Sequence, residues 1–199
     1  MPEQHQSAQF GSTGCFPGNY LLERNMEWTD PVASAVETSV RLMIFGIGNE
    51  MMGDDAAGSL VARELRMMLQ DCDHESFAQV LVAGTNPENF SGLVRNTKPD
   101  LVIFIDAADM GRPVGEVAFL NHKDMHSMMH STHTMPLSFL GDYLEKITGA
   151  RIIALGIQAG QIQLEVPMSR PVAESVKTIS HFLHRAILDK MKAPPEGRP

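Results

Sequence analysis

Cysteine is scarce in this sequence. Among its 199 residues only Cys15 and Cys72 are cysteines. Two cysteines cannot build the disulfide framework that supports small secreted domains, and they cannot supply a zinc site made mainly of thiolates. Any metal chemistry in this chain must therefore use histidine and carboxylate side chains.

Positive charge and long apolar runs are also in short supply. The 16 Lys and Arg residues face 24 Asp and Glu residues, which gives a formal net charge of -8. Nucleic acids and anionic lipids attract clustered positive charge, so neither is the expected partner. No stretch approaches the roughly 20 apolar residues that span a bilayer, and residues 1–9 are polar rather than basic and then apolar. We expect a cytoplasmic monomer without membrane insertion.

The composition changes at about residue 40. Residues 1–40 are rich in Ser, Thr, Gly and Asn and lack a long hydrophobic period, yet they contain the only tryptophan, Trp28. We interpret them as an N-terminal extension, partly disordered or docked on the domain, with a helix start at Asp30-Pro31. Residues 41–190 form a single domain. Residues 191–199 contain a Pro-Pro pair and form a flexible tail.

Short apolar runs alternate with helical patterns along the domain. The runs predict strands at residues 42–47, 79–82, 101–105, 115–120 and 151–157, and the helical patterns lie at 54–69, 87–97, 136–147 and 171–191. Alternation of this kind predicts an α/β fold with a mostly parallel sheet covered by helices on both faces. Open sheets of this type place their sites at the carboxyl ends of the strands.

A glycine-rich stretch, residues 46–55, follows the first predicted strand and reads Gly-Ile-Gly-Asn-Glu-Met-Met-Gly-Asp-Asp. Glycines allow a sharp turn and a close approach to a ligand, so a nucleotide-binding loop is one interpretation. The spacing disagrees, because Met51 occupies the third glycine position of a dinucleotide fingerprint and no Gly-Lys-Ser/Thr is present.

The paired acids that end this stretch, Asp54 and Asp55, have two interpretations. A carboxylate at the start of a helix satisfies free N–H groups and suits the helix dipole, so one of the two is explained as a cap. The second would then point from the turn toward the carboxyl edge of the sheet. There it offers an oxygen ligand for a metal.

Asp106 closes the most apolar run of the chain. Burying an unpaired carboxylate is costly, so this side chain needs a partner. A hydrogen bond to the neighbouring turn at residues 109–111 is one explanation. We favour a functional role, because the predicted position is the carboxyl end of a strand, where desolvation should also raise the basicity of the acid.

Half of the eight histidines lie between residues 121 and 136. His122, His126 and His130 are four residues apart and would share one helix face, as zinc-binding pairs sometimes do. Such a stripe is more typical of a solvated face, and no Glu stands beside a His pair as a metalloprotease base. His133 differs, because it lies in the turn that leads into a predicted helix at Pro136.

Asp55, Asp106 and His133 are our candidate catalytic and metal-binding residues. Two carboxylates and one imidazole would make an open site that suits nickel, zinc or iron better than calcium. No Ser or Cys nucleophile lies beside a base in a recognisable motif, so a metal or a water molecule must carry any hydrolysis.

Four blocks of the sequence, in order, resemble the motifs of the [NiFe] hydrogenase maturation endopeptidases, most of all the HycI type. The blocks are residues 46–58, 105–111, 131–137 and 155–158, and the match covers about residues 41–190. The resemblance implies a twisted five-stranded sheet between helices. It also implies an endopeptidase that removes the C-terminal extension of a [NiFe] hydrogenase large-subunit precursor after nickel insertion.

The same resemblance assigns the nickel contacts to Asp55, Asp106 and His133, with Asp54 only as a neighbour. Many members end the second strand with an acid before glycines. Here Val82-Ala83 stand in that place, so no substrate contact from that acid is carried over. The extension at residues 1–40 has no assigned role.

Our hypothesis is that nickel arrives with the substrate. Three protein ligands of mixed type do not saturate a nickel site, so substrate cysteines would supply the rest, and other divalent metals would be able to substitute. A non-proteolytic nickel-binding assembly factor for hydrogenase is the alternative.

Methionines surround the candidate site and have two interpretations, an adaptable apolar surface for the precursor's tail or core filling. They are Met51, Met52, Met125, Met128, Met129 and Met135.

Overall fold

The computed structural model describes residues 26–121, 124–125 and 136–193. Its centre is a five-stranded sheet with strand order β2-β1-β3-β5-β4. The strands are β1 (Leu42–Ile47), β2 (Ala78–Gly84), β3 (Leu101–Ala108), β4 (Val117–Asn121) and β5 (Arg151–Gln158). Strand β4 runs antiparallel to β5, and the other neighbours are parallel. The predicted α/β fold with a mostly parallel sheet is therefore confirmed.

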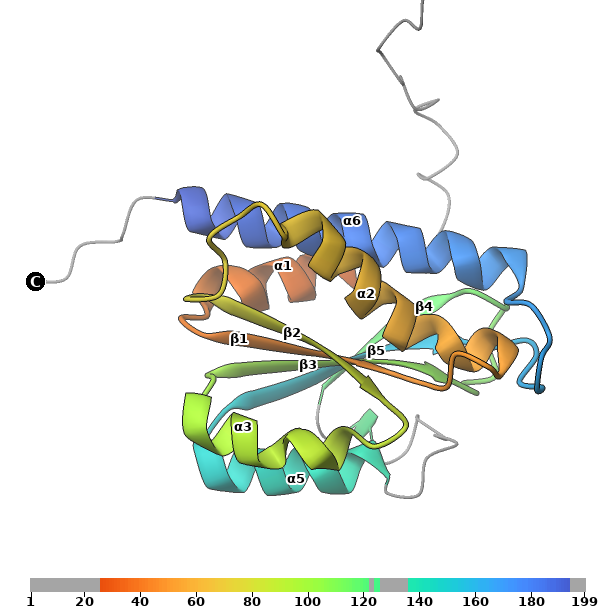
Figure 1. Cartoon of the computed structure of the whole chain (residues 1–199), viewed down its shortest axis with the longest axis horizontal. Helices are drawn as coiled ribbons and strands as arrows, with labels where there is room; N and C mark the ends of the chain where they lie inside the picture. Colours follow the sequence, from red (N-terminus) through yellow and green to blue (C-terminus); the bar gives the residue numbers. More distant parts are fainter. Residues whose placement is uncertain (1–25, 122–123, 126–135, 194–199) are drawn as a thin grey trace, which may run out of the picture.

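Helices cover both faces of this sheet (Figure 1). They are α1 (Thr29–Thr38), α2 (Ala57–Leu69), α3 (Ser91–Thr97), α5 (Leu137–Thr148) and α6 (Arg170–Lys192). One hydrophobic core lies between the sheet and α1, α2 and α6, and a second lies between the sheet and α3 and α5. Strands β1 and β3 are buried along their whole length, which explains why both appear in the sequence as continuous apolar runs.

Several predicted boundaries need correction. The helix expected at residues 54–69 is divided into a 3₁₀ turn, η1 (Gly53–Ala56), and the helix α2. The helix expected at 87–97 likewise begins with a 3₁₀ turn, η2 (Pro87–Phe90), before α3. At the other end of the chain α6 continues to Lys192, so the predicted boundary at residue 191 falls too early.

Helix α1 packs on α6 through the single tryptophan. Trp28 is 3% exposed, and its ring meets Phe182 edge to face with centroids 4.9 Å apart. The helix begins at Thr29, one residue before the predicted start, and its Val32 and Val36 belong to the same core as α6. Residues 28–38 are therefore part of the folded domain.

No helix in the part of the chain that the structure describes is long and apolar enough to cross a membrane.

Replacement of Trp28 by alanine tests the docking of α1. We expect Trp28→Ala to lower the free energy of unfolding by about 3–5 kcal/mol, because it removes a large buried side chain and leaves a cavity. Val40→Ala is the control, since Val40 is 68% exposed, and it should change stability by less than about 0.5 kcal/mol. Urea unfolding followed by circular dichroism measures both. Equal stabilities of the two variants would contradict the docking.

Candidate functional site

The carboxyl edge of the sheet is built on close contact between helix α2 and two strands. A Cβ atom placed on Gly58 would lie 2.0 Å from the carbonyl oxygen of Ile105 in β3 and 2.4 Å from that of Ile47 in β1. A Cβ atom on Gly46 would lie 2.2 Å from the carbonyl oxygen of Gly58. The first turn of α2 therefore rests directly on the backbones of β1 and β3, and no side chain fits between them.

Gly48 turns the chain so that Asp55 lies against the end of β1. Its φ is 134°, and a Cβ atom there would lie 1.7 Å from the carbonyl oxygen of Asp55. The Asp55 Oδ2 atom accepts a hydrogen bond of 2.9 Å from the backbone N–H of Asn49. Asp55 is 3% exposed, so the glycine-rich stretch holds its carboxylate at the strand end, largely shielded from water.

The backbone N–H groups of this stretch are used within the protein. Gly48 donates to the carbonyl oxygen of Gly84 at 3.0 Å, and Met52 donates to that of Asn49 at 3.0 Å. Met51 donates to the Asn49 side chain, also at 3.0 Å. A phosphate-binding loop needs such N–H groups free for its ligand. The geometry therefore argues against the nucleotide interpretation of the glycines.

Asp106 is fully buried beside the end of β1. The register pairs Ile105 with Gly46 on one side, and Asp106 with Gly156 of β5 on the other. Strand β3 runs on for two residues beyond Asp106, so this acid lies inside the strand rather than after it. Asp55, which lies against the end of β1, and Asp106, two residues before the end of β3, are thus placed at the same edge of the sheet.

The turn after β3 is organised by Gln158, which is 5% exposed. The Gln158 Oε1 atom accepts hydrogen bonds from the N–H groups of Met110 (2.7 Å) and Arg112 (3.1 Å), and its Nε2 atom donates to Asp109 Oδ1 (3.2 Å). The N–H of Gly111 donates to the same Asp109 oxygen at 3.2 Å. The sequence offered the turn at residues 109–111 as the partner for Asp106, and in that turn the N–H groups of Met110 and Gly111 donate to Gln158 and Asp109.

Asp54 has a different role from the predicted helix cap. Its Oδ2 atom accepts hydrogen bonds from the N–H groups of Gly160 (2.8 Å) and Gln161 (3.0 Å) and from the Ser169 hydroxyl (3.0 Å). Its Oδ1 atom accepts one from the Ser169 N–H at 2.6 Å. Neither η1 nor α2 has a side-chain cap. Asp54 instead joins the glycine-rich stretch to the segment between β5 and α6.

The third predicted ligand, His133, lies outside the described residues, as do His122, His126 and His130. Among the residues that the structure describes, no three His, Cys, Asp or Glu side chains come together as a metal site. The structure thus brings Asp55 and Asp106 to one edge. The assignment of Asp55, Asp106 and His133 as a set stays a prediction.

Two of the methionines named above fit different interpretations, core filling for one and an exposed apolar surface for the other. Met125 is 2% exposed and belongs to the core between the sheet and α5, so it fills space. Met51 is 58% exposed and lies in the glycine-rich stretch. Met128, Met129 and Met135 lie outside the described residues.

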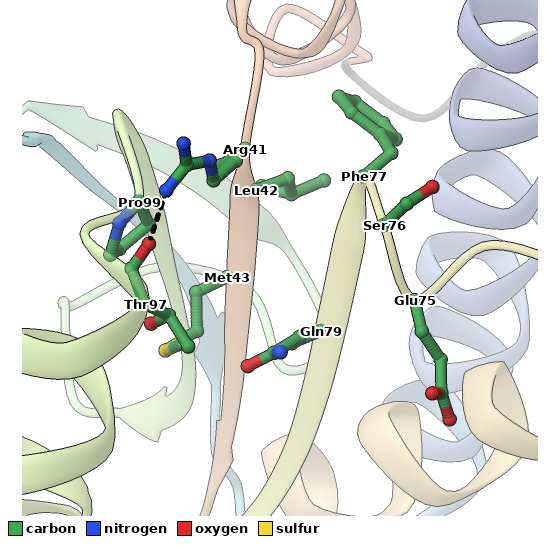
Figure 2. A pocket seen from close by; sticks show the side chains of 9 residues that line it. All are labelled: Arg41, Leu42, Met43, Glu75, Ser76, Phe77, Gln79, Thr97 and Pro99. Carbon is green, nitrogen blue, oxygen red and sulfur yellow. Dashed lines mark hydrogen bonds between the residues drawn. The ribbon is translucent and has the colours of Figure 1, made fainter.

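A small cavity lies at the opposite edge of the sheet, at the amino ends of β1 and β2 (Figure 2). Its volume of about 30 Å³ accommodates water but no peptide. Arg41 closes one side by donating to the carbonyl oxygen of Thr97 at 2.8 Å. Nearby, the Asp100 carboxylate accepts the N–H groups of Val40 (2.7 Å) and Arg41 (2.9 Å). These contacts hold together the amino ends of the strands.

Sequence reasoning missed the roles of Asp54, Gln158 and Ser169. Gln158 had a local signal, because it directly follows an apolar run. Asp54 and Ser169 are 115 residues apart, and nothing in the spacing of either residue indicates that they meet.

Comparison with known proteins decides the family. The family model named HycI, hydrogenase maturation protease, matches residues 60–186. The chain belongs to this family. The hydrogenase 3 maturation protease of Escherichia coli K12 is 35% identical over 134 residues, which are 67% of this chain and 82% of that protein.

Solved structures of hydrogenase maturation proteases have the same fold. The crystal structure of the [NiFe] hydrogenase maturation protease HycI from Thermococcus kodakarensis is similar with a TM-score of 0.70 and 30% identity, covering 79% of this chain and 99% of that one. The solution structure of the endopeptidase HycI from Escherichia coli has a TM-score of 0.60 and 31% identity, covering 71% and 87%.

The contact of α2 with the strands can be tested in this hydrogenase maturation protease by adding one methyl group. We expect Gly58→Ala to lower the free energy of unfolding by about 1–3 kcal/mol, because the methyl group forces α2 away from β1 and β3. It should also speed hydrogen exchange at the Asn49 N–H, which is bonded to Asp55. Nothing lies within 4 Å of a Cβ atom on Gly92, so Gly92→Ala should leave both quantities unchanged or stabilise slightly. Similar behaviour of the two variants would contradict the close contact.

Proposed function

We propose that this chain is the endopeptidase that removes the C-terminal extension of a [NiFe] hydrogenase large-subunit precursor after nickel insertion. One observation carries the proposal. A member of the hydrogenase maturation protease family holds two buried carboxylates, Asp55 and Asp106, at the carboxyl edge of the sheet, where open sheets of this type bind ligands.

Nickel in the precursor serves as the recognition element. Asp55 and Asp106 supply oxygen donors, and His133 supplies the nitrogen donor that suits nickel better than hard cations. Three protein ligands leave coordination positions that cysteine thiolates of the precursor can fill. The metal therefore belongs to the substrate, and a precursor without nickel lacks the group that these side chains bind.

Hydrolysis then adds water to the carbonyl carbon of the scissile amide and breaks its C–N bond. Metal-bound groups hold the peptide against the carboxylates, which removes much of the entropic cost of the reaction. Asp106, which is fully buried at this edge of the sheet, either binds the metal or accepts the proton of the attacking water and passes it to the leaving amine.

Substitution of the three side chains tests the assignment. Asp55→Asn, Asp106→Asn and His133→Ala should each keep the far-ultraviolet circular dichroism spectrum and lower the cleavage rate by about 100-fold or more, as expected for loss of a ligand or a general base. His126→Ala should cleave like the unaltered chain. Mass spectrometry of the large subunit gives the rate. An equal loss of cleavage rate in His126→Ala and His133→Ala would show that the wrong histidine is assigned.

The role of nickel is tested with the precursor itself. Incubation of the purified chain with nickel-loaded precursor should yield a shortened large subunit, whereas nickel-free precursor should stay intact. Cleavage of both forms would exclude nickel as the recognition element. Nickel binding with no cleavage of either form would support the alternative, a non-proteolytic assembly factor.

A further inference from the structure

The segment between β5 and α6, residues 159–169, lies beside the glycine-rich stretch at the carboxyl edge of the sheet (Figure 1). We call it the β5–α6 loop. Besides its four hydrogen bonds to the Asp54 carboxylate, its Gln161 carbonyl oxygen accepts the N–H of Asp54 at 2.9 Å. The N–H of Glu165 donates to the carbonyl oxygen of Met51 at 2.8 Å. Hydrogen bonds thus join two segments that lie about 110 residues apart in the chain.

Asp54 is the centre of this connection. Its side chain is 0% exposed, and such a carboxylate is tolerated only where hydrogen bonds replace those of water. Both of its oxygens accept bonds from the β5–α6 loop, and hydrogen bonds to a carboxylate are stronger than those between neutral groups. The loop is therefore held in one arrangement before any ligand arrives.

Each of the two joined segments presents a large apolar side chain to the solvent. In the loop, Leu164 is 61% exposed and adjoins Glu165; in the glycine-rich stretch, Met51 is 58% exposed and accepts the Glu165 hydrogen bond. Glu165 has a φ of 59°, a left-handed conformation that costs energy for a residue with a side chain. Two segments that hydrogen bonds join beside the candidate site thus each expose one large apolar side chain, and the loop that carries Leu164 is strained at Glu165.

We infer that the β5–α6 loop, with Asp54 as its positioning residue, forms the wall that binds the substrate's polypeptide next to the scissile bond. This inference rests on the proposed function. The occupant is an extended, apolar stretch of the large-subunit precursor that flanks the cleaved amide. Asp54 and Asp55 are consecutive, so the wall is continuous with the candidate site.

The exposed leucine gives the most direct test. Steady-state cleavage of nickel-loaded precursor and its dissociation constant, from biolayer interferometry, are measured for the unaltered chain and for Leu164→Asp. We expect KM and the dissociation constant to rise about tenfold, as for an interface side chain of this kind, with kcat little changed. Met67→Asp is the matched control, because Met67 is also 58% exposed but lies near the carboxyl end of α2; it should change neither constant.

The positioning role of Asp54 is tested by two substitutions, Asp54→Asn and the milder Ser169→Ala. Ser169→Ala removes only one hydrogen bond, so it should keep the fold even where Asp54→Asn does not. Hydrogen exchange at Gly160, Gln161 and Ser169 should accelerate, and KM should rise in the same order as the exchange rates. Asp100→Asn removes a carboxylate that accepts two backbone N–H groups at the opposite edge, so it should lower stability without raising KM. A merely structural role of Asp54 would lower the active fraction, and hence apparent kcat, with KM unchanged.

The outcomes separate this inference from the proposed function. Normal cleavage with unchanged KM in Leu164→Asp would show that the β5–α6 loop does not bind the precursor, and it would leave the proposed protease function standing. Binding of precursor that Leu164→Asp weakens, without cleavage by the unaltered chain, would support the wall and overturn the proteolytic function. A dimer of the unaltered chain in light scattering that Leu164→Asp dissociates, with unchanged precursor binding, would assign the surface to a second copy of this chain.

Discussion

The contact of Gly58 with the carbonyl groups of Ile47 and Ile105 sets the geometry of the whole carboxyl edge. It brings α2 onto β1 and β3 at a distance that excludes every side chain, and Gly46 and Gly48 make room for the same approach. The position of Asp55 follows from this contact, because the chain must turn within a few residues from the end of β1 to the start of α2. The three glycines, which have no side chain, therefore shape the candidate site as much as the carboxylates do.

The three central strands of the sheet, β1, β3 and β5, were predictable because they are buried almost along their whole length. The run at residues 42–47 coincides with β1, and the extended runs at 101–105 and 151–157 each fall within a strand that is one to three residues longer. The excess residues, Asp106-Ala107-Ala108 in β3 and Gln158 in β5, are polar or small and carry no strong hydrophobic signal. The 3₁₀ turns before α2 and α3 escaped prediction for a related reason, since apolar spacing does not distinguish them from a first helical turn.

The candidate site was predictable only in part. Asp106 stood out because it closes an apolar run, and Asp55 because it belongs to the paired acids that end the glycine-rich stretch; the structure places both at one edge. The functions of Asp54 and Ser169 depend on a contact between distant segments, which local periodicity cannot report. The two adjacent acids thus contact different parts of the molecule: Asp54 accepts hydrogen bonds from the segment between β5 and α6, whereas Asp55 accepts one from the N–H of Asn49 in its own stretch.

The packing of α1 has a consequence for the order in which the protein forms during synthesis. Of the helices and strands that the structure describes, α1 is made first, whereas α6, which packs on Trp28, is made last. Lys190, near the end of α6, also donates a hydrogen bond of 2.6 Å to the carbonyl oxygen of Glu37 at the end of α1. The part of this face that α6 covers consequently waits for residues 170–192, and a nascent chain exposes those apolar side chains until α6 has been made.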